Sequence, residues 1–311
     1  MNKSFWLPEA ASELAPEIDS LFYFVTWASG ILFVGVMVAM LYFAWRYRRR
    51  EALEVPAPVE PSKVIEITWI VLPTILVLVL FNWGFRVFIK QGVAPPDSYE
   101  IKVRASMWKW DFEYPDGTVS TGELHVPVDR PVRLLMSSTD VLHSFFVPEF
   151  RTKQDVLPDR YSSVWFTATR RDTFDVFCTE YCGTGHSAML ARVFVHSQDD
   201  FVEWLQSAGD DEDVPLPELG ERLYQQQQCF ACHTIDGSAG IGPTFKGIYG
   251  STETMADGEV VQVDENYLRE SILEPGARIV QGYQNIMPNA YGSLTERQVS
   301  ALIAFIQAQA E

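Results

Sequence analysis

The sequence predicts a multidomain membrane protein, with a two-helix transmembrane hairpin followed by an all-β domain and then an all-α domain. Three patterns in the 311 residues predict this order. Two long apolar runs come first, short alternating segments occupy the middle, and amphipathic helical segments fill the end. We place the boundaries at residues 1–95 for the N-terminal tail and hairpin, 96–206 for the β domain, 207–217 for an acidic linker and 218–311 for the α domain.

Both apolar runs are long enough to cross a bilayer as helices. Residues 21–45 contain no Asp, Glu, Lys, Arg or His, and they exceed the roughly 20 residues that a hydrocarbon core requires. Residues 67–85 span it with less margin, and a buried hairpin in a soluble core would ordinarily be shorter. The connecting loop is basic from Arg46 to Lys63, whereas the segment before the first run is acidic. Because positive charge stays inside, we expect both termini on the outer side.

The segments beyond the hairpin change from strand-like to helical. Aromatic and β-branched residues alternate with polar ones in the middle of the chain, at a spacing that predicts a β-sandwich or barrel. These expected strands are residues 100–104, 132–137, 162–167, 174–177 and 191–195. After the linker, apolar residues recur at helical spacing. The expected helices are residues 218–228, 265–273 and 295–309.

The charge is strongly negative and uneven. The chain has 41 acidic and 24 basic residues, giving −17. From Asp210 onward it has 16 acidic and 5 basic residues. Such a field repels nucleic acid, so we expect no nucleic-acid partner. It attracts a cationic protein and increases the encounter rate more than the final affinity.

One loop concentrates metal-binding side chains. In Cys178-Thr-Glu-Tyr-Cys182-Gly-Thr-Gly-His186-Ser-Ala-Met189, two thiols, an imidazole and a thioether lie within one short stretch. Soft sulfur ligands with imidazole select copper, and a blue-copper site needs only one cysteine. A second cysteine lets two sulfurs bridge two copper ions, which can share one unpaired electron. The simplest alternative in an oxidising compartment is a disulfide, which the neighbouring ligands argue against.

A dinuclear site needs a second histidine, and the chain offers one upstream. His143 stands in Asp140-Val-Leu-His143-Ser-Phe-Phe-Val-Pro148, an apolar and strand-like segment. A lone histidine in such a setting is more often structural. Together with the cysteine loop, we predict that His143 is a copper ligand.

The cysteine loop, the His-Ser-Phe-x-x-Pro segment and the two-helix anchor closely resemble subunit II of the haem-copper cytochrome oxidases over residues 15–200. The resemblance implies a cupredoxin fold holding a copper A centre, with Cys178 and Cys182 bridging its two metals. It implies one histidine on each copper and two weaker ligands. These four ligands are His143, His186, Met189 and the backbone carbonyl of Glu180. The Glu180 side chain would also reach a magnesium ion shared with subunit I.

Two more residues match positions of that family. Trp108, in Met107-Trp-Lys-Trp110, matches a tryptophan near the copper that receives electrons from soluble cytochrome c. It could equally pack the sandwich, and a fused haem domain could change the route. Glu66, at the cytoplasmic start of the second span, matches a glutamate at the mouth of a proton channel. Its alternative is an ordinary carboxylate at the membrane surface.

The second pair of cysteines belongs to a different motif. Cys229-Phe-Ala-Cys232-His233 is the attachment sequence for covalent haem c, in which two thioethers hold the haem and His233 binds the iron. The other axial ligand should be a methionine. We predict Met287, because Met255 lies in an acidic stretch where we expect it to be exposed.

The end of the chain resembles the small class I c-type cytochromes over residues 216–309. The resemblance rests on the Gly-Ile-Gly-Pro243 and Ile-Met287-Pro segments and on the closing helix. His125 and His196 remain without a role, and we expect both at the surface. The sequence offers no motif for hydrolytic or phosphate chemistry.

Together the parts resemble the caa3-type variant of subunit II, which carries a fused cytochrome c domain. The resemblance implies the subunit that takes electrons from a cytochrome c donor. It passes them by haem c and copper A to subunit I, which reduces oxygen to water with proton pumping. Subunits I and III are the expected partners, in a bacterial cytoplasmic membrane.

Three other functions fit some of these features. The first is the copper A subunit of a nitric oxide reductase. Nitrous oxide reductase shares the copper loop, but the membrane anchor and the lack of a propeller argue against it. A tethered copper-delivery module would not need the covalent haem.

Overall fold

The computed structural model describes residues 6–51, 55, 58, 60–207, 214–289, 291–292 and 294–310. Most of the expected acidic linker, residues 208–213, lies outside the described residues. The chain divides into two compact units, Leu14–Val93 and a larger unit of Met1–Glu13 with Ala94–Glu311. The smaller unit is the hairpin, and the larger one holds both the β domain and the α domain.

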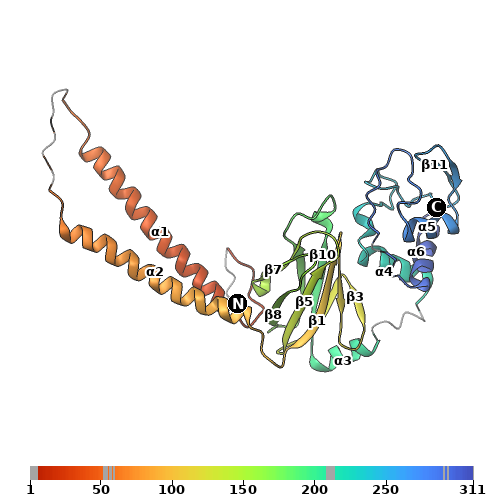
Figure 1. The fold of residues 1–311 in the computed structure, drawn as a ribbon, viewed down its shortest axis with the longest axis horizontal. Helices are drawn as coiled ribbons and strands as arrows, with labels where there is room; N and C mark the ends of the chain where they lie inside the picture. The colour runs from red at the N-terminus through yellow and green to blue at the C-terminus, as the bar shows by residue number, and fades with distance from the viewer. Residues whose placement is uncertain are drawn as a thin grey trace. The chain divides into compact units, whose positions relative to one another are not determined.

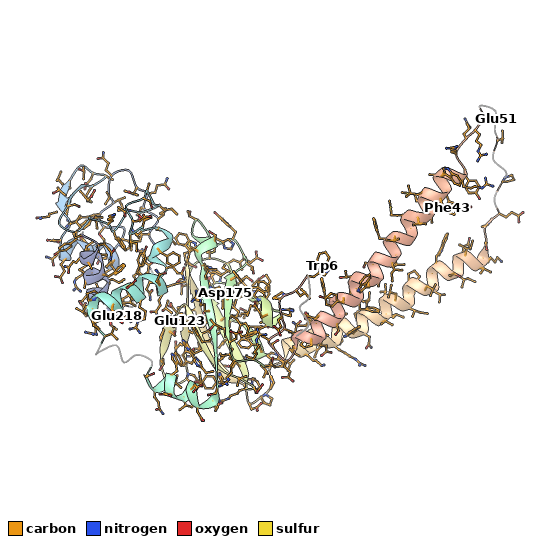
Figure 2. All side chains as sticks on the ribbon, turned by 180° about the vertical axis from the view of Figure 1, so that it is seen from behind. Trp6, Phe43, Glu51, Glu123, Asp175 and Glu218 are labelled. Atoms are coloured by element: carbon orange, nitrogen blue, oxygen red, sulfur yellow. The ribbon has the colours of Figure 1, made fainter. Side chains whose placement is uncertain are left out.

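The hairpin consists of two long apolar helices, α1 (Ala15–Arg46) and α2 (Lys63–Gly92) (Figure 1). Both are long and apolar enough to cross a membrane. Side chains project from them on all sides, with Phe43 as an example in Figure 2. Both helices are longer than the predicted spans because polar residues at their ends are also helical. Two of these polar residues pair between the helices, since the Lys90 ammonium lies 2.6 Å from the Glu17 carboxylate. The predicted hairpin is confirmed.

The middle of the chain is a sandwich of two five-stranded sheets. One sheet has the strand order β3-β2-β1-β5-β8 and the other β4-β10-β9-β6-β7. The first sheet is formed by β1 (Tyr99–Ser106), β2 (Lys109–Glu113), β3 (Val119–Thr121), β5 (Pro131–Ser138) and β8 (Ser162–Thr167). The second is formed by β4 (Glu123–Pro127), β6 (His143–Val147), β7 (Thr152–Val156), β9 (Thr173–Cys178) and β10 (Leu190–His196).

The core of the sandwich follows from the alternation of side chains along each strand. In β5, Val132, Leu134 and Met136 are fully buried, and the residues between them are partly exposed. Alternate residues of a strand face the same side, so this pattern places one face of β5 against the opposite sheet. The predicted all-β domain is confirmed, and it is a sandwich.

A short helix closes one end of the sandwich and buries a histidine. On α3 (Gln198–Ser207), the Trp204 ring stacks on His125 of β4 with centroids 3.9 Å apart. His125 is 6% exposed, and its Nδ1 lies 2.8 Å from Nε2 of His196. Burial lowers the pKa of the half-buried His196. The expectation that His125 is a surface residue is therefore wrong, because Trp204 of α3 covers it, whereas His196 is half-buried.

The α domain is built around two crossing helices, α4 (Leu216–Gln226) and α6 (Glu296–Ala308). At the crossing, a Cβ on Gly220 would lie 2.0 Å from the carbonyl oxygen of Ala301, so glycine permits the close approach. Thr295 caps α6 in a capping box with Gln298. The remaining elements are β11 (Thr252–Thr254), β12 (Val260–Gln262) and α5 (Glu265–Leu273), with three-residue 3-10 turns at Pro148–Phe150, His186–Ala188 and Cys229–Ala231.

Met255 belongs to the core of this domain. It is 1% exposed, and the Tyr267 hydroxyl donates to its Sδ at 3.9 Å. The expectation that Met255 is exposed is wrong. Met255 lies between the strands of the short β11–β12 hairpin and points inward, whereas its acidic neighbours Asp257 and Glu259 are exposed.

Candidate copper and haem sites

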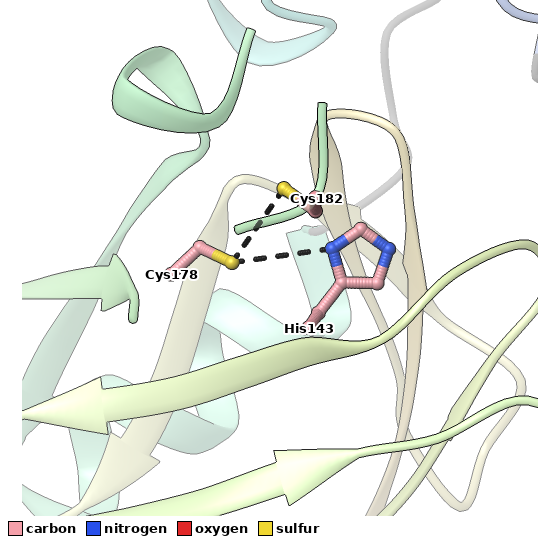
Figure 3. Close-up of side chains that lie close together, drawn as sticks. All are labelled: His143, Cys178 and Cys182. Carbon is pink, nitrogen blue, oxygen red and sulfur yellow. Dashed lines mark hydrogen bonds between the residues drawn. The ribbon is translucent and has the colours of Figure 1, made fainter. Parts of the chain in front are cut away.

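Two strands bring the predicted copper ligands together. Strand β9 ends at Cys178 and pairs with β6, where Phe145 lies opposite Cys178. Strand β6 begins at His143, so the pairing places this imidazole beside the cysteine loop. Ligand atoms of His143, Cys178 and Cys182 all lie within 4.8 Å of one another (Figure 3). Residues that are 35 positions apart in sequence therefore share one site.

The sulfur and nitrogen atoms form a compact cluster. The two Sγ atoms are 3.8 Å apart, and neither cysteine is in a disulfide. Nδ1 of His143 lies 4.0 Å from Sγ of Cys178, and Nδ1 of His186 lies 3.5 Å from Sγ of Cys182. Sδ of Met189 lies 3.7 Å from Sγ of Cys182. Each sulfur has its own imidazole, which fits a pair of metals better than a single ion.

The two thiols influence each other's protonation. The hydrogen bond between Cys178 and Cys182 lowers the pKa of Cys178 to about 3 despite its burial. The same pairing raises the pKa of Cys182. The cluster therefore holds one thiolate readily without a metal, and thiolate is the form that binds metals.

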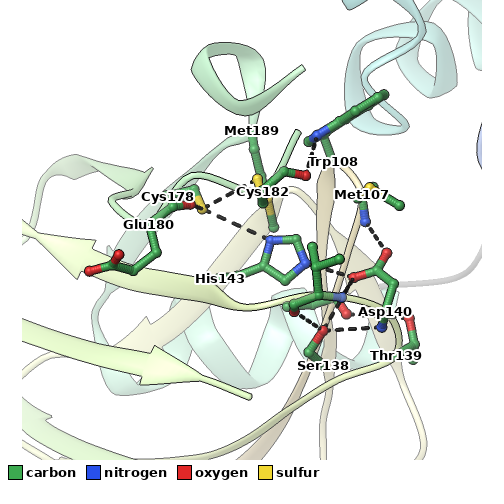
Figure 4. A network of polar contacts seen from close by, with 12 residues as sticks. Met107, Trp108, Ser138, Thr139, Asp140, His143, Cys178, Glu180, Cys182 and Met189 are labelled. Atoms are coloured by element: carbon green, nitrogen blue, oxygen red, sulfur yellow. Dashed lines mark hydrogen bonds and ion pairs between the residues drawn. The ribbon is translucent and has the colours of Figure 1, made fainter. Parts of the chain in front are cut away.

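Glu180 presents its backbone and its side chain in different directions. Its carbonyl oxygen lies 3.3 Å from Sγ of Cys178, beside the sulfur cluster. Its carboxylate lies away from the cluster in Figure 4, and Oε1 is 3.3 Å from Nζ of Lys153. The carbonyl is therefore available to the copper site, and the carboxylate points elsewhere.

Asp140 fixes the orientation of the His143 ring. Its Oδ1 accepts from Nε2 of His143 at 2.8 Å, which leaves Nδ1 facing Cys178 (Figure 4). The carboxylate also accepts from the backbone N–H groups of Met107 and Val141, both at 2.6 Å. Burial opposes charge on His143, but the hydrogen bond to Asp140 raises its pKa overall. Sequence reasoning missed this residue, although an aspartate three positions before a candidate ligand is a recognisable signal.

Trp108 lies against the copper loop. Its indole N–H donates to the carbonyl oxygen of Cys182 at 3.1 Å, and the ring is 7% exposed. A Cβ on Gly185 would lie 2.5 Å from the ring, so the loop contacts its face closely. Trp108 also lines the cavity formed by the haem-attachment loop, together with Cys229 and Cys232. It therefore contacts the copper loop and borders the candidate haem cavity.

The haem-attachment loop positions its histidine for iron. Nδ1 of His233 donates to the carbonyl oxygen of Pro243 at 2.8 Å, which leaves Nε2 as the free ligand atom. The ring stacks on Phe245 with centroids 4.7 Å apart. Burial lowers the pKa of His233, which favours the neutral imidazole that binds metals. A Cβ on Gly242 would lie 2.6 Å from the ring, so this neighbour must be small.

An apolar cavity opens beside His233 and contains one of the two candidate methionines. Met287 lines it, together with Cys229, Cys232 and His233. Met255 is not among the residues that line this cavity. The apolar lining and the paired cysteines fit a covalently bound haem with Met287 as its second axial ligand.

Glu66 lies apart from both sites, in the first turn of α2. Its backbone N–H donates to Ser62 at 3.0 Å, and the residue is exposed in the hairpin.

Three protein families match the chain in sequence order. Residues 1–87 match "Cytochrome C oxidase subunit II, transmembrane domain". Residues 117–196 match "Cytochrome C oxidase subunit II, periplasmic domain". Residues 217–310 match "Cytochrome c". The matches therefore cover the hairpin, most of the sandwich and the α domain.

Relatives named cytochrome c oxidase subunit 2 align with long stretches of the chain. That of Alkalihalophilus pseudofirmus is 30% identical, covering 88% of this chain and 82% of its own. That of Thermostichus vulcanus is 32% identical, covering 65% and 80% respectively. Among solved structures, the periplasmic domain of the Bradyrhizobium japonicum oxidase subunit II is 27% identical. It covers 38% of this chain and 99% of its own, with a TM-score of 0.37.

Proposed function

The chain belongs to the cytochrome c oxidase subunit 2 family, and on that premise we propose that it is the electron-accepting subunit of a terminal respiratory oxidase of the caa3 type. Membership of this family supports a role as an electron-transfer subunit of an oxidase, and we propose that subunit I is its partner. Its β domain belongs to a family that implies copper A, and its α domain to one that implies haem. The observation that carries the finer proposal is Trp108, which contacts the copper loop and lines the candidate haem cavity.

The residues of the two sites would hold the two redox groups. We assign copper A to two bridging thiolates, two imidazoles and two weak donors, and haem c to two thioethers and two axial ligands. The copper set is Cys178, Cys182, His143, His186, Met189 and the Glu180 carbonyl; the haem set is Cys229, Cys232, His233 and Met287. When bound, these groups supply one-electron couples.

Trp108 is our proposed contact between the two sites. Because its ring is 7% exposed and faces the haem cavity, a soluble donor would have little access to it. We propose that an external c-type cytochrome reaches the haem domain first, and that Trp108 serves the tethered haem. A tether of this kind makes the transfer effectively intramolecular.

Further roles follow from the family resemblance and remain proposals here. They are a magnesium site at the Glu180 carboxylate, a proton-channel role for Glu66 and association with subunit III. In the same proposal the chain is anchored in a bacterial cytoplasmic membrane, and its partner reduces oxygen with proton pumping. The matched families support a membrane protein whose β domain lies on the outer side.

The first experiment is to isolate the native membrane complex through this chain, identify its haems and measure oxygen uptake from reduced cytochrome c. Haem A beside haem C, with oxygen consumed, is the expected result. Haems B and C alone, with nitric oxide consumed and oxygen not consumed, would replace the oxidase with a nitric oxide reductase.

A further inference from the structure

A buried lysine joins the β domain, which we call the copper domain, to the α domain, which we call the haem domain. Lys109 follows Trp108, and its side chain is 5% exposed. Its Nζ lies 3.2 Å from Oδ2 of Asp111 and donates to Oε1 of Gln227 at 3.2 Å. The ammonium also lies 6.0 Å from the centre of the Tyr291 ring, within reach of a cation–π contact. Asp111 belongs to the copper domain, whereas Gln227 and Tyr291 belong to the haem domain.

The partners of this lysine are themselves held in place. The Thr121 hydroxyl donates to Oδ1 of Asp111 at 2.6 Å, across the pairing of β2 and β3. On the other side, the backbone N–H of Gln227 donates to Leu223 at 2.8 Å, which extends α4. The Tyr291 hydroxyl donates to the Gln227 carbonyl at 3.4 Å. Lys109 therefore bonds to one fixed acceptor in each domain.

A second contact lies next to the ligands of both sites. The Gln228 side-chain amide donates to the carbonyl oxygen of Leu190 at 3.1 Å. Gln228 immediately precedes Cys229, and Leu190 immediately follows Met189. A shift of this contact would move the haem-attachment loop relative to the copper loop.

The cost of burying an ammonium group makes the contact specific. A lysine is almost never fully buried unless it is paired, because an unpaired charge loses its hydration without compensation. Docking in another register would separate Lys109 from Gln227 and leave the ammonium with one partner. An apolar interface could slide, whereas a buried charge with fixed acceptors favours one arrangement.

Building on the electron-transfer role proposed above, we propose that Lys109 is a positioning residue that fixes the haem-attachment loop in register against Trp108. The lysine does not itself exchange electrons. It determines the distance between the haem-attachment loop and Trp108, and how much that distance varies.

The test compares Lys109→Met with the wild-type chain in the intact complex. Methionine keeps most of the length and removes the charge, leaving Asp111 without its cationic partner. Because a hydrogen bond to a charged group is lost, amide hydrogen exchange at residues 226–229 should rise by about tenfold or more. Haem-to-copper electron transfer after flash reduction should slow, while both absorption spectra stay unchanged.

Matched variants separate positioning from general destabilisation. Lys102→Met removes an exposed lysine that pairs with Glu113 on the same sheet, and it should change neither readout. Gln227→Leu should reproduce the effect from the haem domain, and the double variant should add little to either single one. Wild-type exchange at residues 226–229 in Lys109→Met would overturn the proposal. Slow haem-to-copper transfer in the wild-type chain would instead count against the proposed electron route. The two proposals can fail separately, because hydrogen exchange tests the contact between Lys109 and Gln227 without any electron transfer.

Discussion

At the scale of single residues, the copper site depends on a carboxylate that does not touch the metal position. Asp140 holds Nε2 of His143 and is held in turn by two backbone N–H groups. Residues that orient a metal-binding histidine typically contribute 10–100-fold in metal affinity. We therefore expect Asp140→Ala to lower copper affinity by roughly that factor. Competition with a chelator, followed by copper absorbance in the full-length chain, measures this loss.

The matched control for that variant is Asp172→Ala. This aspartate is ion-paired with Arg170 at 3.5 Å, and its side chain is exposed. It should leave copper affinity unchanged, and the haem c absorbance should be unaffected in both variants. Equal chelator sensitivity in wild type and Asp140→Ala would show that packing alone orients His143.

The candidate copper ligands could be proposed from the sequence because most of them lie close together along it. Cys178, Cys182, His186 and Met189 occupy one loop, and their types and spacing identify the chemistry. Lys109 gave no such signal. Its partner Gln227 is 118 positions away, and only the folded chain brings the two together. Interactions of this kind depend on how domains meet, which periodicity does not encode.

At the scale of elements, the haem domain depends on the crossing of α4 and α6 at Gly220. An added Cβ would lie 2.0 Å from the Ala301 carbonyl and 2.6 Å from Cβ of Phe305, so backbone would have to move. Overpacking of this kind costs about 1–3 kcal/mol. We expect Gly220→Ala to lower the stability of the haem domain by that amount. Denaturant unfolding followed by haem absorbance measures it, with copper absorbance reporting the sandwich separately.

Gln225→Ala is the control on the same helix. Gln225 is exposed, so its replacement should change the unfolding midpoint little. Unfolding of Gly220→Ala at the wild-type midpoint would mean that α4 and α6 separate at low cost.

Strands and helices were predicted well where their own periodicity determines burial, as in β5. Elements covered by another part of the chain were not. His125 was expected at the surface because β4 alone gives no sign that α3 places Trp204 over it. Met255 was missed for the same reason, since neighbouring elements of the haem domain enclose it. Local polarity predicts exposure only when nothing else packs on the segment.

At the scale of the whole molecule, the order of hairpin, sandwich and helical domain could be read from the sequence. The reason is that each part has a different hydrophobic pattern: continuous, period two or helical. The contact between the copper and haem domains could not be read in this way. Lys109, Gln227 and Gln228 take part in it, and polar residues ordinarily predict exposed surface.

The same uneven charge that the sequence displays leads to a prediction about the electron donor. The part of the chain from Asp210 onward has 16 acidic and 5 basic residues, so a cationic cytochrome should be attracted to it. Raising the salt concentration to about 0.15 M shortens the screening length to about 8 Å. We therefore expect kcat/KM for a cationic donor to fall steeply with salt, measured as oxygen uptake by the intact complex.

The internal step should respond differently to salt. The Lys109 ammonium is buried between its acceptors, and buried pairs are screened far less than exposed ones. Haem-to-copper transfer after flash reduction should therefore stay nearly constant over the same salt range. A kcat/KM that is insensitive to salt would mean that the donor does not approach the acidic domain. An internal rate that falls in parallel with kcat/KM would mean that the two domains separate in solution, because exposed charges would then hold them together.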